Sequence, residues 1–194
     1  MATLRVNHAG TRWQPACEAV KAELATRVAR VQQAMVVGVG RDVHLRQRYM
    51  ALVLTAELGD VARALNDAGE LVAELVDFAA EALVAVTHLW HDGQGILPEA
   101  WVHVGREMAR WEELKAQGAF EWCITDPVSH QQRLAVLAEE VGELVEAILS
   151  GHLAGVSTEL VQVAAVALGW LQVAMDEEAA AAGDAGEVAV GGAL

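Results

Sequence analysis

An acidic helical pattern occurs twice in this sequence, and it constrains the fold more than any other feature of the chain. Segment 54–60 (LTAELGD) matches segment 137–143 (LAEEVGE) in its leucine, glutamate, glycine and final acidic positions. Segment 74–77 (ELVD) matches segment 159–162 (ELVQ), at nearly the same offset along the chain. Internal repeats define the architecture of the chains that carry them. The sequence therefore predicts two similar halves packed into one body.

Each matched segment places two polar side chains three residues apart. On a helix, residues at that spacing share one face, with about 5–6 Å between their Cβ atoms. Carboxylates gathered in this way repel one another, and the repulsion grows as water is excluded. A divalent cation such as Mg²⁺, which prefers carboxylate oxygens, removes that repulsion. The candidate metal ligands are Glu57, Asp60, Glu74 and Asp77 in the first half and Glu140, Glu143, Glu159 and Gln162 in the second.

The composition favours an all-α fold. Hydrophobic residues make up 54% of the chain, and only 3 residues are proline. Alanine, leucine and glutamate, which are abundant here, are good helix formers. The periodicity predicts a bundle of about six helices, three in each half, related by a pseudo-twofold axis. They are expected at residues 16–37, 42–66, 70–90, 98–117, 127–149 and 157–178.

The expected helices divide the chain into three parts. We predict a first repeat over residues 15–92, a second repeat over residues 98–178, and a loosely ordered tail over residues 179–194. Asp126 is the expected N-cap of the fifth helix, with Pro127 at its first position. Three helices with one acidic edge bury little surface alone, so the two repeats are expected to share one core.

Charge and cysteine content narrow the classes of function. The formal net charge of −14 argues against binding to the phosphate backbone of DNA or RNA. Two cysteines are too few for a disulfide framework, which favours a reduced, cytoplasmic setting. Charged residues interrupt every apolar run before it is long enough to span a bilayer, so no membrane segment is predicted.

At the acidic pairs the sequence resembles the all-α nucleoside triphosphate pyrophosphohydrolases, the MazG-like family. Their signature is E-x-x-E, a connection, and E-x-x-D, and both halves approximate it. The resemblance implies hydrolysis of a nucleoside triphosphate to the monophosphate and pyrophosphate, with Mg²⁺ (or Mn²⁺) held by the acids. It also implies that Glu140 takes part in catalysis and that Glu139 binds a second metal or accepts a proton from the attacking water. Sites in this family usually form across a dimer, so a homodimer and a monomer with a pseudo-dimeric core are both expected forms.

Neither half matches that signature in full. Asp60 stands in place of a glutamate in the first half, and Gln162 stands in place of an aspartate in the second. Either half is therefore a candidate for the working site. Contacts to the triphosphate and the base are expected from basic and aromatic side chains of the second half: Arg110, Trp111, Lys115 and Arg133.

The imperfect motifs leave two other interpretations open. One is a non-catalytic, duplicated helical protein that binds a nucleotide or a protein partner without turnover. The other is a metal-binding helical bundle with redox chemistry. A di-iron bundle requires Glu-x-x-His motifs, and the sequence contains none.

Overall fold

The computed structural model describes residues 14–34, 42–67, 70–90 and 97–190, and these residues form six α-helices and no strand. The predicted all-α class is therefore confirmed. The first four predicted helices agree with α1 to α4 to within two residues at every end that the structure describes, and the predicted end of the first helix, residues 35–37, lies outside the described part of the chain. In order, the helices are α1 (Gln14–Ala34), α2 (Val43–Asn66), α3 (Leu71–Trp90), α4 (Leu97–Ala116), α5 (His130–Ser150) and α6 (Leu153–Val190).

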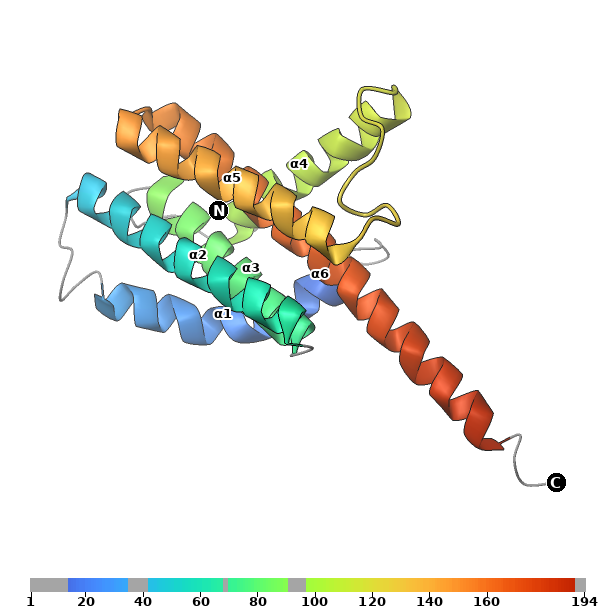
Figure 1. The fold of residues 1–194 in the computed structure, drawn as a ribbon. Helices are drawn as coiled ribbons and strands as arrows, with labels where there is room; N and C mark the ends of the chain where they lie inside the picture. Colours follow the sequence, from blue (N-terminus) through green and yellow to red (C-terminus); the bar gives the residue numbers. More distant parts are fainter. Residues whose placement is uncertain (1–13, 35–41, 68–69, 91–96, 191–194) are drawn as a thin grey trace.

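Helices α3 and α6 form the centre of the bundle (Figure 1). They pack against each other, while α1 and α2 pack on α3, and α4 and α5 pack on α6. Residues 78–86 of α3 and 163–172 of α6 are buried at every position. A helix that is apolar on all sides belongs in a core. The many alanines in these two stretches let the neighbouring backbones approach closely.

The packing of the first three helices is matched by that of the last three. Helix α1 contacts α6 as α4 contacts α3, and the equivalent helices α2 and α5 contact each other. Buried positions correspond as well, because the matched segments align Leu54 and Val61 of α2 with Leu137 and Leu144 of α5, and all four are buried. This correspondence supports the internal duplication, which remains a prediction.

Helix α5 begins three residues later than the sequence predicts. Its N-cap is Ser129, whose hydroxyl accepts a hydrogen bond from the backbone N–H of Gln132. The Gln132 side chain in turn accepts a hydrogen bond from the Ser129 N–H, which completes a capping box. The expected N-cap, Asp126, instead accepts from the backbone N–H of Cys123 and pairs with Lys115. Asp126 therefore anchors the connection before α5 rather than the helix itself.

Helix α6 is longer than predicted at both ends. It begins at Leu153 and continues to Val190, so the prediction of a loosely ordered tail is wrong for residues 179–190. This segment is rich in alanine, which has the highest helix propensity, and it extends a helix that the core already holds. The end of α6 projects beyond the rest of the bundle (Figure 1). Residues 191–194 lie outside the described part of the chain.

Part of α6, Leu153–Ala182, is long and apolar enough to cross a membrane. In its most apolar window, 61% of the residues are buried inside the protein. The central position of α6, between α3, α4 and α5, accounts for this composition without a membrane.

Candidate functional site

Three of the ligands predicted for the second half converge between α5 and α6. One carboxylate oxygen from each of Glu140, Glu143 and Glu159 lies within 4.8 Å of the other two. Glu140 and Glu143 are one turn apart on α5, and Glu159 approaches them from α6, which packs against α5. We call these three residues the second acidic cluster. A single divalent cation is able to contact carboxylates at this spacing.

Burial and mutual repulsion disfavour the charged form of this cluster. Burial, followed by the charges of Glu143 and Glu159, raises the pKa of Glu140 from 4.5 to about 7. Burial and the charge of Glu143 also raise the pKa of Glu159. The buried Oε2 atoms of Glu140 and Glu159 have no hydrogen-bond partner among the described residues. Since buried polar atoms are normally paired, these two oxygens suit contact with a cation.

The remaining residues predicted for the second half lie beside the cluster. Gln162 follows Glu159 by one turn of α6, so the two side chains lie on the same side of the helix. Gln162 is partly buried. Glu139 is exposed, and its charge adds to the repulsion that raises the pKa of Glu140.

Three of the ligands predicted for the first half also converge, between α2 and α3. One carboxylate oxygen from each of Glu57, Glu74 and Asp77 lies within 4.8 Å of the other two. We call these residues the first acidic cluster. Asp60, the fourth predicted ligand, instead pairs with Arg63 on the same helix. Its shorter side chain is thus engaged on the surface of α2.

A guanidinium group from α1 lies in the first acidic cluster. Nη1 of Arg27 is 3.1 Å from Oε1 of Glu57, and Nη2 is 2.7 Å from Oδ2 of Asp77. Nη1 is also 3.3 Å from Oε2 of Glu81, and Nε is 3.3 Å from Oε1 of Glu23. The side chains of Arg27 and Glu81 are only 8% and 6% exposed. Four carboxylates therefore surround one buried cation, which arginine keeps charged at any physiological pH.

A pocket of about 470 Å³ opens beside the second acidic cluster. It is lined by Glu139 and Glu140 of α5, Trp111 of α4, Val166 of α6, and residues 119–124 of the connection between α4 and α5. This connection contributes two further aromatic rings to the wall. Apolar and aromatic walls with a few polar groups are typical of small-molecule sites, and aromatic faces stack on nucleobases. The pocket therefore suits a planar ring attached to a group that reaches the carboxylates.

The basic residues of α4 differ in their surroundings. Arg110 is 49% exposed and pairs with Glu107. The charge of Glu140 contributes to the raised pKa of Arg110, so this guanidinium lies within electrostatic reach of the second acidic cluster. Lys115 instead pairs with Asp126 and ties the end of α4 to the connection that follows it. Of these two predicted phosphate ligands, only Arg110 lies toward the cluster.

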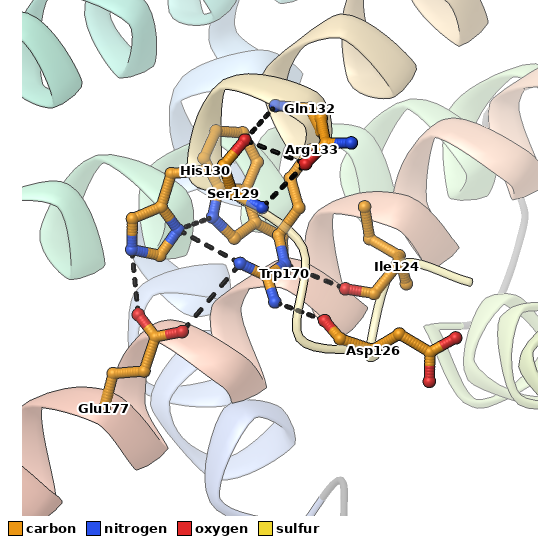
Figure 2. A network of polar contacts seen from close by, with 8 residues as sticks. All are labelled: Ile124, Asp126, Ser129, His130, Gln132, Arg133, Trp170 and Glu177. Atoms are coloured by element: carbon orange, nitrogen blue, oxygen red, sulfur yellow. Dashed lines mark hydrogen bonds and ion pairs between the residues drawn. The ribbon is translucent and has the colours of Figure 1, made fainter. Parts of the chain in front are cut away.

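The structure gives Arg133 a structural role in place of the predicted contact with substrate. Its side chain is 1% exposed. Its Nε donates to the carbonyl of Ile124 at 2.9 Å, and its Nη2 donates to the carbonyl of Asp126 at 2.7 Å (Figure 2). These two donors hold the backbone of the connection that lines the pocket.

A second set of contacts fixes the start of α5 to α6 (Figure 2). The indole N–H of Trp170 donates to Nδ1 of His130 at 3.0 Å, and Nε2 of His130 lies 2.9 Å from Oε2 of Glu177. Because Nδ1 accepts a hydrogen bond, Nε2 carries the ring proton and donates to the carboxylate. Together with Arg133, this chain of contacts positions one wall of the pocket.

The sequence prediction did not include Arg27 or Glu81, although the position of each in its helix indicates a buried charge. Arg27 lies one turn after Leu24, on the apolar stripe of the first helix. Glu81 is the only charged residue within the apolar run 78–86. A charge on a buried face requires a partner, so the two positions together indicate an internal ion pair.

No protein-family model, no curated protein and no solved structure matches this chain. The resemblance to the MazG-like family therefore remains a prediction.

Proposed function

We propose that this chain is a metal-dependent nucleoside triphosphate pyrophosphohydrolase whose working site lies in its second half. The observation that carries the proposal is the second acidic cluster. Its three carboxylate oxygens lie within 4.8 Å of one another, two of its residues have buried oxygens without partners, and an aromatic pocket adjoins it. The resemblance of the acidic pairs to the MazG-like signature supports the same activity.

The donor set of the second acidic cluster fits Mg²⁺, with Mn²⁺ as an alternative. Glu140, Glu143 and Glu159 would hold the ion through carboxylate oxygens, which hard divalent cations prefer. Mg²⁺ usually retains waters and substrate phosphates as further ligands, and three protein carboxylates leave room for both. When bound, the ion would supply neutralisation of phosphate charge and activation of a water molecule.

In the proposed reaction, water attacks the α-phosphorus of the nucleotide and passes its proton to Glu139. This carboxylate is exposed in the pocket beside Glu140, where a general base is needed. The bond between the α-phosphorus and the bridging oxygen breaks, and pyrophosphate leaves. Arg110 exchanges its partner on α4 for a phosphate oxygen of the substrate.

The aromatic side chains of the pocket would bind the base. Trp111 approaches from α4, while Phe120 and Trp122 belong to the connection held by the contacts of Figure 2. Stacking on aromatic rings tolerates every base, since each base has a π-face. Positioning the base in this pocket places the phosphates toward the carboxylates that line it.

Pyrophosphate release from a panel of NTPs and dNTPs with Mg²⁺ tests the proposal. Glu140→Gln and Glu159→Gln are each expected to lower kcat/KM at least about 100-fold, because even outer-shell partners of metal sites are worth about 10–100-fold. Glu146→Gln is the matched control, since Glu146 is exposed on the same helix and belongs to neither acidic cluster. It is expected to retain wild-type activity.

Two outcomes contradict the proposal. Folded wild-type protein that releases no pyrophosphate, yet melts at a higher temperature with nucleotide, would support the non-catalytic binding interpretation. Activity that survives both cluster substitutions would place the chemistry elsewhere in the chain.

A further inference from the structure

The buried faces of α1 and α4 follow the same spacing. At one constant offset along the chain, the buried apolar residues described on this face of α1 align with buried residues of α4. The next position on the face is Arg27 in α1 and Trp111 in α4. The pairs that set this register are Ala16 with Ala100, Cys17 with Trp101, Val20 with Val104 and Leu24 with Met108. Arg27 and Trp111 therefore occupy equivalent places in the two halves.

A second pair of equivalent positions also holds a charged residue in the first half and an apolar residue in the second. Glu81 of α3 aligns with Val166 of α6 at the offset that relates the acidic segments of these two helices. Glu81 is buried and accepts a hydrogen bond from Arg27. Val166 is also buried, and it lines the pocket together with Trp111. The same two places thus hold an ion pair in the first half and an apolar pocket wall in the second.

The ion pair changes what the first acidic cluster is able to bind. Arginine presents its donors in a rigid fork that matches carboxylate oxygens, and two of those donors already engage Glu57 and Asp77. A divalent ion entering the cluster would have to displace these contacts and would be repelled by the guanidinium. The second acidic cluster has two buried oxygens without partners instead.

We propose that the guanidinium of Arg27 takes the place of a divalent cation in the first acidic cluster. Of the two clusters, only the second then binds a divalent metal, and the first half serves as a scaffold. This inference rests on the proposed function for the second half. For the first half it rests on the ion pairs of Arg27 alone.

Counting bound Mn²⁺ tests the inference for the first cluster in isolation. The background protein is Glu140→Gln/Glu143→Gln, in which the second acidic cluster has lost two of its three carboxylates. The probe is the electron paramagnetic resonance signal of free Mn²⁺ at millimolar concentration. The background protein is expected to bind no Mn²⁺ in the clusters. Adding Arg27→Met is expected to create one bound Mn²⁺ per chain, and adding Glu57→Gln to that protein is expected to remove it.

A second variant keeps the test decisive if Arg27→Met does not fold. Arg27→Met/Glu81→Val removes both members of the ion pair and installs the valine of the second half. Circular dichroism with and without Mn²⁺ reports whether each variant is folded. We expect the double variant to fold, with a melting temperature that Mn²⁺ raises.

Three results would overturn the inference. One is Glu57-dependent Mn²⁺ binding while Arg27 is present. Another is a folded Arg27→Met variant that gains no Mn²⁺. The third is failure of both variants to fold even with Mn²⁺, because Arg27 would then be required for packing and not for charge. A failure of the proposed function gives a different result: the wild type would neither bind Mn²⁺ nor release pyrophosphate, yet Arg27→Met would still gain a site.

Discussion

Glu140→Gln is expected to stabilise the metal-free protein at high pH. Burial and acidic neighbours raise the pKa of Glu140 from 4.5 to about 7 in the folded protein. The fold therefore binds this proton more tightly than the unfolded chain does, and stability falls as pH rises from 4.5 through 7. Each pKa unit corresponds to about 1.4 kcal/mol, but solvent screens part of this effect because Glu140 is only partly buried, so the charged carboxylate destabilises the fold by about 2 kcal/mol above that range. Glutamine has no charge and escapes this penalty.

The assay is thermal and denaturant unfolding in EDTA between pH 4 and pH 8.5. The free energy of unfolding of the variant and the wild type is expected to differ little at pH 4. At pH 8.5 the variant is expected to be more stable by about 2 kcal/mol, which for a chain of this size raises Tm by about 4–8 °C. Mg²⁺ is then expected to raise the Tm of the wild type and not that of the variant.

The pH dependence of the difference decides whether this reasoning holds. A stability difference that is the same at both pH values would show that packing, and not charge, is responsible. Glu146→Gln again serves as the control and is expected to show no pH-dependent difference, because Glu146 is exposed. The charged groups near Glu140 are Glu139 and Glu143 on α5, Glu159 on α6, and Glu107 and Arg110 on α4.

Three further predictions concern the first cluster, the pocket and the contacts of Figure 2. In denaturant unfolding at neutral pH, Glu57→Gln is expected to destabilise the protein by about 1–3 kcal/mol, because it weakens a buried contact of Arg27. Trp111→Ala is expected to raise KM for nucleotide about tenfold while kcat changes less, since base stacking is worth about 1–3 kcal/mol; an unchanged KM would remove Trp111 from the base site. His130→Ala leaves the Trp170 indole N–H without its acceptor and is expected to lower the free energy of unfolding by about 1–2 kcal/mol.

The elements and the acidic clusters were accessible from the sequence because they depend on local spacing. A period of 3.6 residues fixes which side chains share a helix face, and the repeat relates the faces of the two halves. Glu140 and Glu143 must therefore point the same way whatever packs around them. The alanine-rich end of α6 has no apolar stripe, yet it is helical because alanine has a high intrinsic helix propensity. Apolar stripes alone therefore do not predict where α6 ends.

The partners of the basic residues could not be predicted from residue spacing within one helix. Arg133 is predicted to contact the substrate, but it lies one turn before Leu137 on the buried stripe of α5, where its donors reach the connection. Arg27 lies on the buried stripe of α1, where its guanidinium contacts carboxylates from α2 and α3. Which buried charge meets which partner depends on how the helices pack, and periodicity within one helix does not contain that information. A charged residue on an apolar stripe nevertheless marks where such a partner is needed.

The two halves differ in which group offsets the repulsion between their clustered carboxylates. Both helix pairs gather three carboxylates within 4.8 Å, and gathered carboxylates destabilise a fold unless a cation accompanies them. In the first half the cation is Arg27, which is part of the chain, so its positive charge offsets part of the repulsion as soon as this half folds. In the second half Trp111 holds the equivalent place, and we propose that this cluster takes its cation from solution. Because α3 and α6 join the two halves, we propose that the first half is a scaffold that needs no metal and that repulsion among the carboxylates of the second half favours binding of a metal ion there.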